Sequence, residues 1–168
     1  TGKMSIAFQI ITPGMNFDLA HAGKGPSDGW FFFSCYNSEQ AYSLLEVNAS
    51  QRDKDFIMAV NWKKAEEYAK AGKGRKVPVE YYSNWYNDET HTGESTVMKE
   101  VLQLDPRELT DLVYFMPCPK SPHGCDVDPT GEYIVGSGKL AALIPVFSFT
   151  KIQAAIAAKD HDGDFMGI

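Results

Sequence analysis

The sequence has no excess of positive charge, and this absence limits the partners that it can have. Its formal net charge is −6 over 168 residues, whereas a nucleic-acid partner calls for a basic face. We therefore expect no nucleic-acid ligand. There is also no apolar run near the roughly 20 residues that a membrane-spanning helix needs, so we expect no membrane insertion.

Cysteine is scarce, and its pattern excludes further classes of protein. The three cysteines, Cys35, Cys118 and Cys125, are an odd number and cannot form a complete disulfide framework within the chain. No C-x-x-C spacing occurs, which disfavours a zinc ribbon or finger. The spacing allows a bridge between Cys118 and Cys125, although such cysteines are more often small buried residues.

The first residues have no initiator methionine and no charged leader followed by an apolar stretch. No export signal is visible, and we expect a mature or truncated piece of a protein. The length favours one domain with a sizeable core. A hydrophobic content of 43% and a charged content of 23% are ordinary for a globular chain.

Short apolar runs bounded by turn residues predict β-strands through most of the chain. The expected strands cover residues 6–11, 29–36, 56–60 and 143–147, with a hairpin of 124–127 and 132–135 around the turn at 128–131. Residues 77–82 and 95–104 each predict an edge strand, and residues 16–28 predict a loop. Short helices should follow the caps Asn61 and Thr150, and Gly72 should end the first one.

Two stretches, residues 56–72 and 143–159, share one order of elements: a strand, a cap and a short helix. Propeller blades repeat as several short antiparallel strands at a spacing of roughly 40–45 residues. The two stretches here are further apart, so residues 73–120 should hold an insertion or part of an extra blade. We therefore predict an all-β fold with short helices, covering about two to three blades of a β-propeller. An α+β domain is the alternative.

A histidine between proline and glycine is the most distinctive candidate site residue. In Ser121-Pro122-His123-Gly124-Cys125, proline restricts the backbone before His123 and glycine frees it afterwards. An imidazole held in this way suits a metal ion. From the local pattern alone, a turn histidine that hydrogen-bonds a neighbouring strand is the commoner outcome.

Oxygen-bearing side chains gather where the strand at 29–36 ends. Tyr36 and Glu39 terminate that strand, and Asp53 and Asp55 follow a polar loop. Such a set suits a hard cation such as calcium. From the spacing alone, a strand-end cap beside a solvated loop is the better explanation.

Together these stretches resemble nitrous oxide reductase, the copper enzyme of denitrification. The resemblance is carried by Gly29–Glu39, by Asp55–Asn61, and by Ser121–Val127 with Gly138-Lys139-Leu140 behind it. It covers essentially the whole chain. Members of that family are several times longer, so the resemblance implies that residues 1–168 are one partial domain, an internal segment of the propeller without the cupredoxin domain.

Nitrous oxide reductases are periplasmic homodimers with an N-terminal seven-bladed β-propeller and a C-terminal cupredoxin domain. The resemblance therefore implies a tetranuclear copper–sulfide cluster on seven histidines in the propeller and a dinuclear copper centre in the cupredoxin domain. Electrons from a donor cytochrome or cupredoxin would pass between subunits. Nitrous oxide would be reduced by two electrons and two protons to dinitrogen and water.

Residue by residue, the resemblance makes His123 a ligand of the copper cluster and therefore the catalytic residue of this chain. The other six ligands would lie outside these residues. Tyr36 and Glu39 match ligands of a structural calcium ion. The calcium aspartate is Asp55 if the following strand sets the alignment, which we prefer, or Asp53 if residues are counted.

A protein of another class is the alternative: a non-catalytic propeller that serves as a binding or scaffold module, with His123 as a plain turn residue. In either case the isolated chain should be inactive, because one ligand cannot hold four copper ions.

Overall fold

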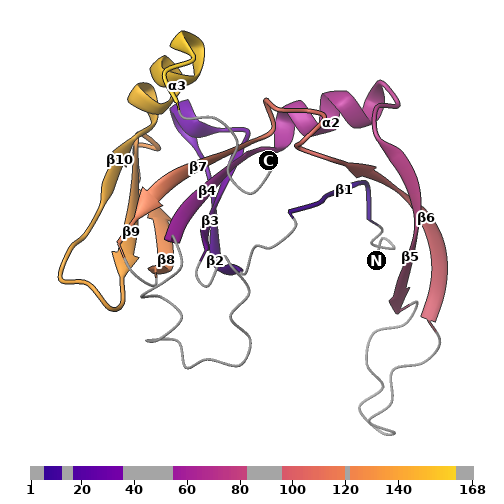
Figure 1. Cartoon of the computed structure of the whole chain (residues 1–168), viewed down its shortest axis with the longest axis horizontal. Helices are drawn as coiled ribbons and strands as arrows, with labels where there is room; N and C mark the ends of the chain where they lie inside the picture. Colours follow the sequence, from indigo (N-terminus) through magenta and orange to yellow (C-terminus); the bar gives the residue numbers. More distant parts are fainter. Residues whose placement is uncertain (1–5, 13–16, 36–54, 83–95, 120–121, 162–168) are drawn as a thin grey trace, which may run out of the picture.

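The computed structural model describes residues 6–12, 17–35, 55–82, 96–119 and 122–161. Within these ranges ten strands form three separate sheets, joined by two short α-helices and one 3₁₀ turn (Figure 1). The expected all-β fold with short helices is therefore confirmed. The arrangement is consistent with part of a propeller, and none of the three described sheets closes on itself.

The largest sheet has four antiparallel strands in the order β2-β3-β4-β7. They are β2 (Phe17–Ala22), β3 (Trp30–Cys35), β4 (Asp55–Asn61) and β7 (Val113–Cys118). The predicted strands at 29–36 and 56–60 are thus confirmed as β3 and β4 in the described residues. The predicted loop at 16–28 is wrong, because β2 occupies it. As an edge strand with mostly exposed side chains, β2 lacks the apolar pattern that marks a buried strand.

The second sheet has the order β10-β9-β8 and contains the expected hairpin. Its strands are β8 (Pro122–Val127), β9 (Tyr133–Gly138) and β10 (Val146–Ser148). The turn between β8 and β9 ends at Gly131, whose φ is +79°. Tyr133 N donates to the Asp128 carboxylate across 2.9 Å, and this bond with those from Thr130 lowers the pKa of Asp128 to about 2. The edge strand predicted at 143–147 begins only after Pro145, which has no N–H to donate.

The third sheet is built mainly from a hairpin that lies between β4 and β7 in the chain. After the first helix the chain forms the hairpin of β5 (Arg75–Tyr82) and β6 (Thr96–Leu104), and β1 (Gln9–Ile10) pairs with β6 in parallel. In Figure 1 this sheet lies at the opposite end of the molecule from β8–β10. The insertion expected in residues 73–120 is therefore a separate sheet. The strand predicted at 6–11 shrinks to two residues, and β6 is the central strand rather than an edge.

Both helices begin at a side-chain cap. Helix α2 (Trp62–Lys70) starts after Asn61, whose Oδ1 accepts from Lys64 N across 3.0 Å, and the chain turns out of it at Gly72 with φ of +70°. Helix α3 (Phe149–Ala158) is capped by Ser148, whose Oγ accepts from Lys151 N. The prediction of Thr150 as its cap is wrong by two residues. Thr150 lies inside the helix and donates from Oγ1 to Glu132.

The four-stranded sheet and the β8–β10 sheet repeat one unit. The first runs β2, β3, β4 and then α2, and the second runs β8, β9, β10 and then α3. In each, the first strand is at the sheet edge, and the third leads through a cap into the helix. The repeat expected from residues 56–72 and 143–159 is therefore present. Strand β8 holds in its sheet the place that β2 holds in its own.

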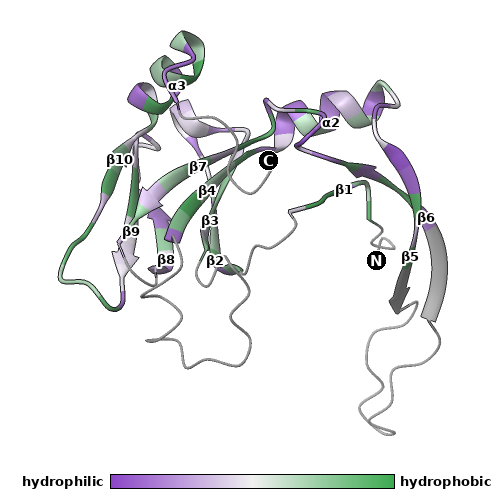
Figure 2. Cartoon of the chain, in the orientation of Figure 1, coloured by the Kyte–Doolittle hydropathy of each residue, from purple (hydrophilic) through white to green (hydrophobic). Residues whose placement is uncertain are grey.

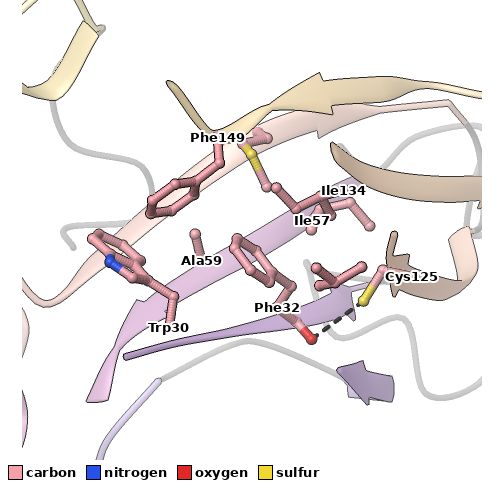
Figure 3. Close-up of a cluster of buried hydrophobic side chains, with 9 residues drawn as sticks. Trp30, Phe32, Ile57, Ala59, Cys125, Ile134 and Phe149 are labelled. Atoms are coloured by element: carbon pink, nitrogen blue, oxygen red, sulfur yellow. Dashed lines mark hydrogen bonds between the residues drawn. The ribbon is translucent and has the colours of Figure 1, made fainter. Parts of the chain in front are cut away.

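A hydrophobic core joins these two units face to face (Figure 3). The ring of Phe149 meets Trp30 at 5.7 Å and Phe32 at 6.3 Å between centroids. The remaining buried members come from β4, β7, β8 and β9: Ile57, Ala59, Met116, Cys125, Val127 and Ile134. Burying these side chains contributes of order 1.5–3 kcal/mol for each large one, so this core fixes how β8 lies against the four-stranded sheet.

Apolar residues are not confined to that core. Figure 2 shows a hydrophobic stretch along the connection from β9 to β10. Leu143, Ile144 and Val146 are 66%, 74% and 58% exposed there. The edge of the second sheet at β10 is therefore strongly apolar.

Candidate functional site

His123 is the second residue of β8, the edge strand of the second sheet. The preceding Pro122 is fully buried and anchors the strand, while the imidazole of His123 is 62% exposed. Its Nδ1 lies 2.5 Å from Oδ2 of Asp18 on β2. Two sheets therefore meet at this histidine, which is held by a carboxylate from the neighbouring unit.

The partner of Nδ1 fixes which ring nitrogen carries the proton. An ionised carboxylate only accepts hydrogen bonds, so Nδ1 of His123 must donate to Asp18. In the neutral ring the lone pair is then on Nε2. A carboxylate on one nitrogen and a free lone pair on the other is the arrangement of metal-binding histidines. The donor set at His123 thus fits a metal such as copper, for which imidazole is a suitable ligand.

Asp18 is a site residue that the sequence did not reveal. It was hidden because residues 16–28 were expected to form a loop, so no strand placed it beside His123. One signal was present: Asp18-x-x-His21 and His123-x-x-Asp126 are the same spacing in opposite order. His21 lies on β2, with Nδ1 3.0 Å from Oδ1 of Asp126 on β8.

Of the expected calcium ligands, only Asp55 falls within the described residues; Tyr36, Glu39 and Asp53 lie outside them. Asp55 is the first residue of β4 and is 5% exposed. Cys35, which precedes Tyr36 in the chain, pairs with Phe56 across β3 and β4. A carboxylate so deeply buried is costly unless hydrogen bonds, a partner charge or a cation compensate it.

Cys35 and Cys118 lie at the same end of the four-stranded sheet, and Cys125 lies on β8 against β3. All three are free thiols. Burial raises the pKa of Cys35 and of Cys118 to about 12, and the nearby Asp55 adds to both shifts. Burial also raises the pKa of Cys125 to about 11. Thiols in this state are poor nucleophiles and poor metal ligands, so they act here as packing residues.

The described residues contain no group of three or more His, Cys, Asp and Glu side chains that could hold a metal ion. His123 would therefore fill only one position of a metal centre. In the same ranges no helix is long and apolar enough to cross a membrane.

Comparison with known proteins confirms the resemblance seen in the sequence. The chain is 29% identical over 158 residues to a nitrous-oxide reductase of Pseudomonas fluorescens, a match that covers 90% of this chain and 20% of the relative. It is 26% identical over 162 residues to the nitrous-oxide reductase of Stutzerimonas stutzeri, covering 95% of this chain and 22% of that protein. The chain thus spans about a fifth of the length of these relatives. A comparison with protein-family models finds no match.

Proposed function

We propose that this chain is an internal segment of the propeller of a copper-dependent nitrous oxide reductase, in which His123 is one ligand of the catalytic copper cluster. The observation that carries the proposal is the His123–Asp18 contact, which directs the lone pair of the imidazole to Nε2. Similarity to two nitrous-oxide reductases over nearly the whole chain supports it.

The fold supports the proposed place of the chain within a larger domain. Two units that repeat one order of strands and pack face to face are what neighbouring propeller blades require. The apolar edge at β10 would be covered by further strands of the same ring. On this proposal residues 1–168 form part of one domain, and the cupredoxin domain, the homodimer and the periplasmic location belong to the longer protein.

The residues of this chain have a defined part in the proposed reaction. When bound, the tetranuclear copper–sulfide cluster supplies the electrons that reduce nitrous oxide. His123 would hold one copper ion through Nε2, and Asp18 would keep the ring in the orientation that this requires. Pro122 is buried and ties the backbone of His123 to the core, so the ligand is placed before the metal arrives.

The test is metal analysis and gas consumption with the full-length protein that contains this chain. We expect copper in stoichiometric amount and conversion of nitrous oxide to dinitrogen when an electron donor is supplied. A scaffold or binding module, the alternative function, would contain no copper and consume no nitrous oxide. That outcome would refute the proposal.

We further propose that Asp55 binds a structural calcium ion together with Tyr36 and Glu39. Its burial at the start of β4 supports this assignment, because a cation offsets the cost of burying a carboxylate. Asp53 is the alternative ligand. Calcium bound there would stiffen the wall of the four-stranded sheet on which β8 and His123 are packed.

Calcium removal tests this assignment in the full-length protein. Chelation should lower the melting temperature, since a ligand at 100 times its Kd stabilises the folded state by about 2.7 kcal/mol. Asp55→Asn should abolish the calcium dependence of melting, whereas Asp28→Asn, at an exposed carboxylate in the turn before β3, should preserve it. Melting that does not respond to calcium, with unchanged copper content, would contradict the assignment.

A further inference from the structure

Strands β2 and β8 lie side by side although they belong to different sheets (Figure 1). No backbone ladder joins them, so side chains must set how far one strand is displaced along the other. Two contacts do this reciprocally. Asp18 of β2 meets His123 of β8, and His21 of β2 meets Asp126 of β8.

The two contacts lie on one side of the strands because both strands are irregular between them. Residues three apart on a regular strand point to opposite faces. In β2, however, the three-residue step from Phe17 to Ala20 pairs with a two-residue step from Cys35 to Phe33 on β3. In β8, the three-residue step from Pro122 to Cys125 likewise pairs with a two-residue step from Gly138 to Gly136 on β9. Each strand thus carries one extra residue, which brings both of its contact residues to the same side.

The His21 side chain contacts both a side chain and the backbone of β8. Its Nδ1 lies 3.0 Å from Oδ1 of Asp126 and 3.3 Å from the backbone N of Val127. The carboxylate needs a protonated Nδ1, and the amide needs an unprotonated one. One of the two contacts is therefore made in either tautomer, so the attachment does not depend on where the proton is.

Close contacts also set how near β8 lies to its neighbouring strands. A Cβ on Gly124 would lie 3.2 Å from Cδ1 of Leu19, closer than ordinary van der Waals contact, so glycine favours the close approach of β8 to β2. Next to it, Sγ of Cys125 lies 3.9 Å from the carbonyl of Leu19 on β2 and donates to the carbonyl of Phe32 on β3 across 3.2 Å. These contacts fix the distance between the strands, and the His21 contact fixes the displacement along them.

We propose that His21 is a positioning residue for His123. It sets the displacement of β8 along β2, and so keeps Asp18 within hydrogen-bond reach of Nδ1 of His123. A shift of one residue, about 3.3 Å, would break that bond and free the ring to rotate. The role in copper binding rests on the proposed function, whereas the role in orienting His123 can be tested without copper.

The test uses the copper-free full-length protein labelled with ¹⁵N-histidine, so that NMR reports the tautomer of His123. We expect the proton on Nδ1 in the wild type. In His21→Leu it should shift in part to Nε2, the tautomer that a free imidazole prefers. His21→Asn places a polar atom where Nδ1 was and should restore the wild-type tautomer. Lys63→Met, which breaks the exposed ion pair of Lys63 with Asp28 elsewhere in the fold, is the matched control and should change nothing.

Copper affinity gives a second readout in the same variants. Loss of an outer contact of this kind costs about tenfold or more in metal affinity, and we expect that loss in His21→Leu but not in His21→Asn. Asp126→Ala removes the carboxylate partner of His21 on β8 and should shift the proton of His123 toward Nε2 in the same direction but to a smaller extent. This variant tests the positioning role if His21→Leu does not fold.

An unchanged His123 tautomer in both His21→Leu and Asp126→Ala would overturn the positioning role. If the tautomer changes as expected but His123→Ala retains all of its copper, the proposed function fails while the role of His21 in orienting His123 stands.

Discussion

The carboxylate partner of His123 determines which nitrogen of the imidazole carries the proton. Exposed ion pairs contribute only about 0–1 kcal/mol to stability, so the Asp18–His123 contact is a weak argument for a role in folding. It is a strong determinant of the tautomer, since the carboxylate requires the proton on Nδ1. The carboxylate imposes that requirement whether or not a metal is bound.

Cys35 provides a test of the core around the expected calcium aspartate. Burial raises the pKa of this thiol from 9.0 to about 12, so the folded protein keeps a proton that the unfolded chain releases above pH 9. The stabilisation is therefore complete below pH 9 and is lost as pH rises toward 12, by up to about 1.4 kcal/mol per pH unit. Urea unfolding of the wild type and Cys35→Ala between pH 8 and 11 should show a shallower decline for the variant. Equal declines would contradict the assigned burial.

The two helix caps occupy equivalent places in the repeated unit. Asn61 caps α2, and Ser148 caps α3. Removing an N-cap costs about 1 kcal/mol, so Asn61→Ala and Ser148→Ala should each lower the free energy of unfolding by roughly that amount. Ser148→Ala should cost more, because its Oγ also donates to Glu132. Denaturant titration measures both.

Asn61→Asp keeps an acceptor for Lys64 N and serves as the control. It should leave the stability within a few tenths of a kcal/mol of the wild type. Loss of stability in Asn61→Asp equal to that in Asn61→Ala would show that the cap is not what Asn61 contributes.

The buried strands β3 and β4 could be predicted from the sequence, whereas the edge strand β2 could not. β3 and β4 are continuous apolar runs, and Asn61 with Gly72 marks both ends of α2, so local pattern was sufficient. β2 has no such pattern because its side chains are exposed, and it forms only because β3 offers it a free edge. The prediction of the α3 cap was wrong because Ser148 and Thr150 are both good capping residues. Only the structure shows that the Thr150 hydroxyl donates to Glu132 instead.

His123 could be singled out from the sequence as a candidate site residue, whereas its partner Asp18 could not. The Pro–His–Gly sequence marks it locally. Asp18 is 105 positions away in the chain, and no periodicity connects residues across such a separation. The mirrored spacing of the two Asp–His pairs becomes meaningful only once β2 and β8 are known to be neighbours.

The described part of the chain consists of two repeated units packed on a shared core and a separate sheet, in which β1 joins the β5–β6 hairpin inserted between β4 and β7. The edge strands β2 and β8 of these units meet at the His123–Asp18 contact. An apolar edge at β10 lies at the other side of the second sheet. This distribution, with the polar His123–Asp18 contact at one edge and apolar surface at the other, is what we expect of the proposed segment of a ring with a metal centre near its axis.

The copper content of the His123→Ala variant of the full-length protein tests the central claim most directly. The account predicts that the variant loses most or all of the cluster copper and the reduction of nitrous oxide, while the copper of the proposed cupredoxin centre remains. His161→Ala, at a histidine packed against the ring of Tyr114, should retain full copper content. Full cluster copper in His123→Ala would contradict the assignment of this histidine as a ligand.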